Sequence, residues 1–326
     1  GRVHWTIAMA RYIQRRILIT IPILLAVTVL SFLLLQLTPG DPLNSYVPAD
    51  QPMPAAQREA LRHELGLDRP LPIRYFYWLG QAVQGNLGVR AKNFQPVSEA
   101  IGQRIGPTLL LMGTAMAIGI SLGVALGVVA AVRQYSVLDL ALSIFAFLGL
   151  SVPVYLAGLG ALYLLALRLG WFPVGGFATP GQPFSVWDRL DHLILPAAII
   201  GLNYVASTMR YTRAAMLEAL GQDYVRTARA KGLAERAAIG VHALRNALLP
   251  VLTIVGSYVP NLLAGAVFVE SIFAWPGMGR LFLDGVESRD YPLIMGMILV
   301  LAIVTLVANL LTDVAYAIVD PRIRYG

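Results

Sequence analysis

Residues 17–37 read ILITIPILLAVTVLSFLLLQL and contain no charged side chain. A helix rises 1.5 Å per residue, so about 20 apolar residues cross the roughly 30 Å hydrocarbon core of a bilayer. Only helices and closed barrels satisfy their backbone polar groups in lipid, and the sequence does not show the roughly ten-residue alternation of barrel strands. Residues 17–37 therefore predict a membrane-spanning helix.

The composition extends this prediction to the whole chain of 326 residues. The hydrophobic fraction is 57% and the charged fraction is 13%, about half the charged share of soluble domains. We predict five further spans, at residues 108–132, 140–167, 193–209, 248–269 and 293–318. The predicted fold class is an all-α integral membrane protein with six transmembrane helices.

Two features inside these spans predict local geometry. Pro153 lies within the third span, so it should kink that helix. Gly119, Gly123 and Gly127 are spaced four residues apart on the second span. They form a flat stripe that lets another helix approach closely.

The distribution of charge predicts the orientation. The net charge is +7, and the N-terminal tail 1–16 holds four arginines and no acid. This tail resembles the start of a signal peptide, but the apolar run after it is too long and ends in a poor cleavage site, so we expect a permanent helix. We assign four segments to the cytoplasm, namely 1–16, 133–139, 212–247 and 319–326. They carry 13 basic and 5 acidic residues, which predicts that both termini lie inside.

Residues 38–107 form the one sizeable segment outside the predicted spans. Prolines at 48, 52 and 54 mark turns, and residues 55–67 show helical spacing that ends near Gly66. We expect a small extracytoplasmic cap between the first two helices, packed on the outer surface.

Several kinds of chemistry have no support in the sequence. There are no cysteines, no metal-ligand spacing and no G-x-x-x-x-G-K-[ST] loop, so we expect no metal, no cofactor and no nucleotide hydrolysis in this chain. Residues 119–123 read GISLG, which matches the G-x-S-x-G string of serine hydrolases. That chemistry needs a strained strand-to-helix turn, whereas this string lies in mid-helix, so an intramembrane hydrolase centred on Ser121 is a minor alternative.

No acidic or basic side chain lies well inside a predicted span, which argues against proton-driven transport. The polar groups within the spans are neutral. The candidate residues are Asn203, Ser207, Ser257, Asn261 and Asn309. They could line an aqueous path for a polar solute, or they could hydrogen-bond between helices, and the sequence leaves both interpretations open.

Residues 221–250 read GQDYVRTARAKGLAERAAIGVHALRNALLP, a basic segment between two hydrophobic spans. Such a segment could rest on anionic lipid, or it could form short helices that dock into another protein. Because the excess arginine is better explained as loop charge, we expect no nucleic-acid partner.

Motifs along the whole chain point to one family. The central ones are DYVRTARAKGL at 223–233 and HALRNALLP at 242–250. The others are TPGDP at 38–42, ELGLD at 64–68, GNLG at 85–88, VESIFAWPGMG at 269–279, RDYP at 289–292 and DPRIR at 320–324. Together they resemble the first permease subunit of ABC importers for dipeptides, oligopeptides and nickel. Residues 226–228, RTA, stand where the general family pattern has E-A-A, so no glutamate contact is expected there.

The resemblance implies a type I ABC-importer permease in the bacterial cytoplasmic (inner) membrane. It implies as partners a second homologous permease subunit, two cytoplasmic ATPase subunits that hold ATP and Mg²⁺, an extracytoplasmic substrate-binding protein and membrane lipid. Residues 228–233 would sit as a short helix in a groove of one ATPase. The residues implied in coupling are Arg226, Thr227, Ala228, Arg229, Ala230, Lys231, Gly232 and Leu233.

The substrate implied by the resemblance is a dipeptide or oligopeptide. A nickel chelate, an opine or a glutathione-like solute fits the same motifs. A self-sufficient channel or carrier is a further alternative from a different class of protein.

Overall fold

The computed structural model describes residues 2–37, 41–46, 53–260, 262 and 266–319. The chain divides into two compact units, residues 1–106 with 277–326 (unit 1) and residues 107–276 (unit 2). Within the described residues every regular element is helical, apart from one isolated bridge between Val89 and Pro96. The predicted all-α class is therefore confirmed.

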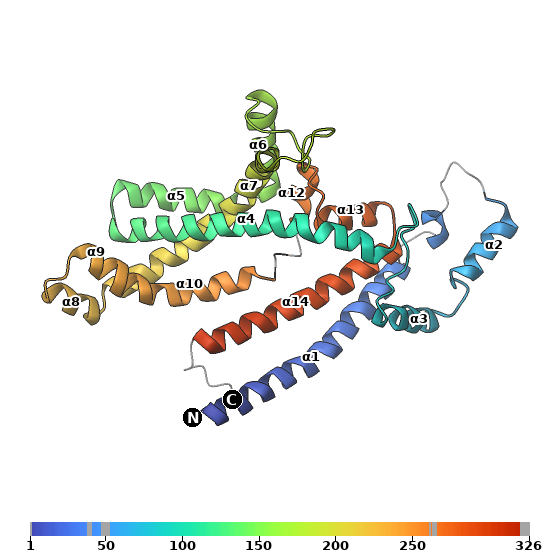
Figure 1. Cartoon of the computed structure of the whole chain (residues 1–326), viewed down its shortest axis with the longest axis horizontal. Helices are drawn as coiled ribbons and strands as arrows, with labels where there is room; N and C mark the ends of the chain where they lie inside the picture. The colour runs from blue at the N-terminus through green and yellow to red at the C-terminus, as the bar shows by residue number, and fades with distance from the viewer. Residues whose placement is uncertain (1, 38–40, 47–52, 261, 263–265, 320–326) are drawn as a thin grey trace. The chain divides into compact units, whose positions relative to one another are not determined.

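Unit 1 is built on two long helices, α1 (Arg2–Leu37) and α14 (Tyr291–Val319), which pack side by side (Figure 1). Its shorter elements are η1 (Pro42–Ser45), α2 (Ala55–Glu64), α3 (Leu71–Val83), α13 (Met278–Glu287) and the start of α4 (Val97–Val132). The expected helix at 55–67 is present as α2, and Gly66 follows it with a φ of +64°. Glycine takes this left-handed conformation at little cost, which ends the helix.

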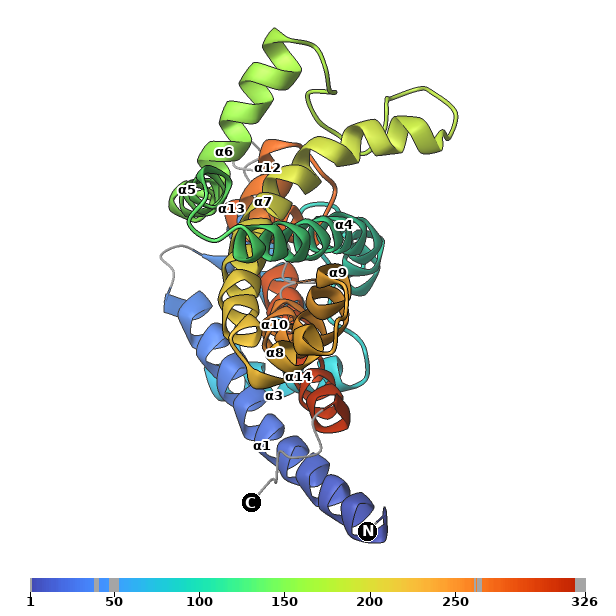
Figure 2. The same ribbon diagram turned by 90° about the vertical axis from the view of Figure 1, so that its left-hand side faces the viewer.

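Unit 2 contains most of α4 and the helices that follow it. These are α5 (Val137–Ser151), α6 (Val154–Ala161), η2 (Leu162–Arg168), α7 (Val186–Leu220), α8 (Asp223–Ala230), α9 (Glu235–Ala237), η3 (Ala238–Ala243), α10 (Leu244–Tyr258) and α12 (Val267–Ile272). Helices α8 and α9 lie beyond the end of α7, near the turn between α4 and α5 (Figures 1 and 2). A cluster of small apolar side chains from α4, α7, α8, η3 and α10 joins these elements.

Five helices of the described chain are long and apolar enough to cross a membrane. They comprise Gln14–Leu37, Val97–Val132, Val186–Leu220, Glu235–Tyr258 and Tyr291–Thr312. A sixth crossing results if α5 and the segment Val154–Arg168 form one span, although the two are bent by 101°. Helices α4 and α7 extend beyond the predicted spans 108–132 and 193–209 because their polar ends continue the same helix.

The bend confirms the predicted effect of Pro153. Val152 caps α5 with φ −82° and ψ 121°, and Pro153 precedes α6. A residue before proline avoids helical angles, and proline itself has no N–H to donate. The consequence is a break rather than a gentle kink.

The glycine stripe on α4 also does what the sequence predicted. A β-carbon added at Gly119 would lie 2.2 Å from Cβ of Tyr204 on α7, and one added at Gly123 would lie 2.6 Å from Cβ of Thr208. Real β-carbons do not approach so closely, so only glycine allows α7 to pack at this distance.

Candidate functional site

The basic segment after α7 folds into a short helix, α8, that has a buried and an exposed face. Asp223 occupies its first turn and Arg229 its last turn, each with the sign that the helix dipole favours. Val225 is buried against Met216 of α7 and the neighbouring small side chains, and Ala228 is buried as well. This apolar contact fixes the orientation of α8 on the end of unit 2.

Seven of the eight residues implied in coupling are exposed, namely Arg226, Thr227, Arg229, Ala230, Lys231, Gly232 and Leu233. We call these seven residues the α8 surface. Ala228 differs because only 5% of it is exposed, so it anchors α8 and is not available to a partner.

The helix is displaced from its expected position. The resemblance implied a short helix over residues 228–233, but α8 ends at Ala230 and Lys231 caps it. Gly232 has a φ of +79°, and its N–H donates to the carbonyl of Arg229. Because residue 232 adopts left-handed angles, the chain turns there and residues 231–233 form a loop.

An ion pair braces this turn. Arg229 donates to both carboxylate oxygens of Glu235, at 3.0 Å from Nε to Oε2 and 2.7 Å from Nη2 to Oε1. The hydrogen bond to Glu235 raises the pKa of Arg229. Arg229 therefore ties α8 to α9, which leaves Lys231 as the exposed cation at the tip of the turn.

A second, more buried ion pair connects this region to the rest of unit 2. Arg213 on α7 donates to Asp139 on α5 through two bonds, 2.6 Å from Nε and 2.8 Å from Nη2. The N–H of Tyr135 also donates to Asp139, at 3.0 Å. The pair locks the turn between α4 and α5 against α7. Sequence reasoning missed it, although both residues had been placed at the cytoplasmic ends of spans.

The structure describes four of the five polar residues proposed to line a pathway, three in unit 2 and one in unit 1. Asn203 and Ser207 lie one helical turn apart on α7, and Asn203 borders a cavity of about 170 Å³ at the bend between α5 and α6. The hydroxyl of Ser257 donates within α10 to the carbonyl of Ile254, at 2.6 Å. Asn309 is exposed on α14 in unit 1. Asn261 lies outside the described residues.

A buried acid in unit 2 was also missed. Glu270 is 0% exposed, and the hydroxyl of Thr108 donates to its Oε1 at 2.9 Å. Nearby, the indole of Trp275 donates to the carbonyl of Pro107 at 3.0 Å. Glu270 directly follows the predicted span 248–269, and sequence reasoning assigned it no partner. The available signal was that it is the single acid in the run VESIF at 269–273.

The structure gives no support to a hydrolase. Ser121 lies inside the continuous helix α4, without the sharp turn that a nucleophile elbow requires. Among the residues that the structure describes, no group of three or more His, Asp or Glu side chains is placed to hold a metal ion.

Several apolar helices long enough to cross a membrane define a multi-pass membrane protein. The chain belongs to the family of binding-protein-dependent transport system inner membrane components, whose profile matches residues 123–325. Residues 9–107 match the N-terminal part of such membrane components. The family resemblance seen in the sequence is thus confirmed, and the chain is a multi-pass protein of the inner membrane.

Relatives match over nearly the whole chain. A Brucella suis biovar 1 protein provisionally named a peptide permease is 52% identical over 317 residues, covering 97% of this chain and 99% of the relative. The oligopeptide transport system permease protein AppB of Bacillus subtilis is 45% identical over 318 residues, covering 97% and 100%. The dipeptide transport system permease protein DppB of Escherichia coli K12 is 37% identical over an alignment of 338 residues, covering 97% and 99%.

Proposed function

We propose that this chain is one permease subunit of an ATP-driven importer for dipeptides or oligopeptides. Relatives that match nearly its full length are named for these two substrates, which supports the peptide class over nickel chelates, opines or glutathione. A second homologous permease subunit would complete the pathway, and an extracytoplasmic binding protein would deliver the solute. Two cytoplasmic ATPase subunits with ATP and Mg²⁺ would perform the hydrolysis, so the chain itself is not the enzyme.

The observation that carries the coupling proposal is the two-faced construction of α8. Its inner face is packed on the rest of unit 2, while the α8 surface presents three basic side chains and the apolar side chain of Leu233 to solvent. A rigid element with one free face suits docking into a groove of a partner. Movement of the ATPases would then pass to α7 and α10 through the packed face, by rigid-body displacement.

The orientation completes the proposal. The predicted segment boundaries place 1–16, 133–139, 212–247 and 319–326 in the cytoplasm, so the α8 surface faces the ATPases. Residues 38–107 then face outward, toward the binding protein. Asn203 and Ser207 would contact solute from α7, with Ser257, Asn261 and Asn309 as the other proposed lining residues.

Gly232→Val tests the coupling role. Valine is strained at a φ of +79°, so the turn after α8 must change, although a β-carbon there meets no atom within 4 Å. With all partner subunits reconstituted in liposomes, we expect ATP hydrolysis to continue while peptide uptake per ATP falls at least fivefold.

The matched control is Gly240→Val on η3, where the β-carbon is also unobstructed and φ is not positive. This variant should transport normally. Normal uptake by Gly232→Val would contradict coupling through this turn, and uptake by the purified chain without ATPases would instead support a self-sufficient carrier.

A further inference from the structure

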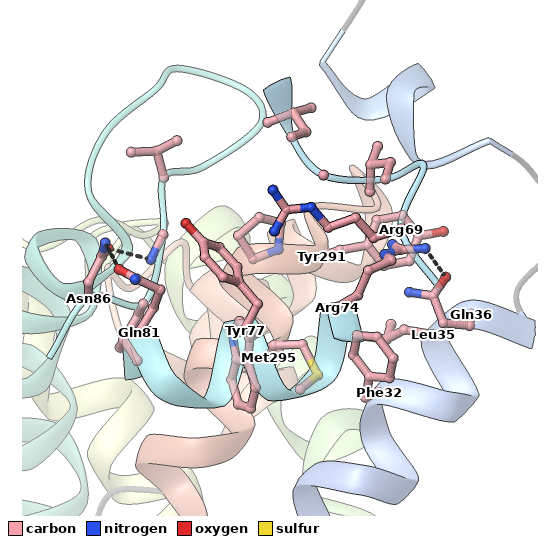
Figure 3. Close-up of a pocket in the computed structure, with 18 of the residues that line it drawn as sticks. Phe32, Leu35, Gln36, Arg69, Arg74, Tyr77, Gln81, Asn86, Tyr291 and Met295 are labelled. Carbon is pink, nitrogen blue, oxygen red and sulfur yellow. Dashed lines mark hydrogen bonds between the residues drawn. The ribbon is translucent and has the colours of Figure 1, made fainter. Parts of the chain in front are cut away.

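Unit 1 contains a pocket of about 360 Å³ between the end of α1, helix α3 and the start of α14 (Figure 3). Residues from three of the sequence motifs line it, namely ELGLD at 64–68, GNLG at 85–88 and RDYP at 289–292. The motif RDYP is far in the sequence from the other two, and neither the coupling turn nor the proposed solute contacts use any of the three. The three motifs therefore converge on one pocket.

Two arginines supply the charge of this pocket. Nη1 of Arg74 donates to Oε1 of Gln36 at 3.2 Å, and Cζ of Arg69 lies 5.4 Å from the ring centre of Tyr77 (Figure 3). Among the ion pairs of the described residues, none joins either arginine to a carboxylate. Glu64, the acid in the pocket wall, is exposed.

The environment of Arg74 is unfavourable for an isolated cation. Burial, followed by the nearby charge of Arg62, lowers the pKa of Arg74. A half-buried guanidinium that contacts a neutral amide and the ring of Phe32 gains from an anion that completes its hydrogen bonds. The pocket is therefore suited to a negatively charged group.

The position of the pocket indicates which anion reaches it. Phe32 and Leu35 belong to the last turns of the apolar span Gln14–Leu37, and Tyr291 and Met295 belong to the first turns of the span Tyr291–Thr312. Both spans end here, so the pocket lies at the boundary between hydrocarbon and water, the level of lipid phosphates. On α3, Tyr77 of the pocket wall is 60% exposed, as aromatic side chains at this boundary often are.

We propose that this pocket binds the headgroup of an anionic phospholipid. The phosphate pairs with Arg69 and Arg74, whose planar guanidinium groups match phosphate oxygens in geometry. The acyl chains lie along the exposed leucines of α1, at positions 30, 33, 34 and 37. Because the pocket wall carries two arginines and one acid, an anionic lipid binds more tightly than a zwitterionic one.

Lipid-dependent thermal stabilisation of the purified intact transporter tests this proposal. Phosphatidylglycerol should raise the melting temperature by several degrees more than phosphatidylcholine does. In the Arg69→Gln/Arg74→Gln double variant this difference should fall to less than half. Lys92→Gln removes one positive charge from an exposed site in the same unit, outside the pocket, and should leave the difference unchanged.

A second variant keeps the test independent of any folding defect. Gln36→Glu would place a carboxylate next to Arg74 and so supply an internal counter-ion. It should keep or raise the melting temperature without lipid, while native mass spectrometry should detect one fewer bound phosphatidylglycerol.

Equal lipid retention by the wild type and both pocket variants would overturn the proposal. So would equal stabilisation by phosphatidylcholine, or full stabilisation by inorganic phosphate alone. Displacement of bound phosphatidylglycerol by a dipeptide would assign the pocket to solute instead. The readout is lipid binding, so it stands whether or not the proposed peptide transport is correct.

Discussion

At the scale of single residues, the close packing of α4 on α7 requires glycines on α4, because a glycine has no β-carbon. A β-carbon at position 123 would lie 2.6 Å from Cβ of Thr208 and 3.0 Å from the carbonyl oxygen of Val205. The second contact is with backbone, which cannot rotate away as a side chain can. Gly123→Ala should therefore destabilise the protein by about 1–3 kcal/mol, although alanine normally favours a helix over glycine.

Thermal unfolding in detergent measures this effect, and Gly113→Ala on the same helix is the control. A β-carbon at position 113 meets no atom within 4 Å, so that variant should be as stable as the wild type or more stable. If the two variants melt at the same temperature, close approach of α7 is not what requires glycine at 123.

Individual residues also show where sequence reasoning stops. The spacing of Gly119, Gly123 and Gly127 was sufficient to predict a contact surface, because spacing alone places residues on one face of a helix. The burial of Ala228 and Glu270 was not predictable, because it depends on which distant segments cover them. The local sequence around Ala228 does not distinguish it from its exposed neighbours. The local sequence around Glu270 indicates an acid in a solvated loop.

At the scale of elements, the ion pair between Asp139 and Arg213 holds the turn between α4 and α5 on α7. Asp139→Asn leaves the guanidinium of Arg213 without its charged partner. We expect a loss of about 2–4 kcal/mol, less than for a fully buried pair because the Arg213 side chain is 28% exposed. Thermal unfolding of the single variants and of the Asp139→Asn/Arg213→Gln double variant measures the coupling energy.

A second ion pair of the same unit provides the comparison. On α8, Nη1 of Arg226 lies 3.4 Å from Oδ1 of Asp223, and the two side chains are 72% and 95% exposed. Exposed pairs contribute little, so Asp223→Asn should cost less than about 0.5 kcal/mol. A similar cost for Asp139→Asn, or a double variant whose loss equals the sum of the two single losses, would show that the buried pair does not brace the element.

The sequence predicted which segments are helical better than it predicted where each helix begins and ends. Hydropathy indicated the apolar helices, and Pro153 indicated the break between α5 and α6. The position of α8 differs from expectation because the chain turns at Gly232. The lengths of α4 and α7 differ from expectation for another reason. Polar residues continue a helix when neighbouring helices hold them, so the end of an apolar run does not mark the end of the element.

At the scale of the whole molecule, the side of the membrane on which each loop lies depends on the bent pair α5 and α6, which forms either one span or a re-entrant segment. The two cases place different loops on each side. Six crossings put Lys92 and Gln182 outside and Lys231 inside. Five crossings, with the bent pair entering and leaving on one side, keep Lys92 outside but put Gln182 inside and Lys231 outside.

The chain contains no cysteine, so each introduced cysteine is the sole labelling site and the unmodified chain is a blank. Lys92, Gln182 and Lys231 are all exposed, which makes them suitable for a membrane-impermeant maleimide. Intact cells should label Lys92→Cys and Gln182→Cys, and only inverted vesicles should label Lys231→Cys. The positive-inside bias favours this result, because five crossings would carry the arginine-rich loop 212–247 across the membrane. Labelling of Lys231→Cys in intact cells would remove the α8 surface from the reach of any cytoplasmic ATPase.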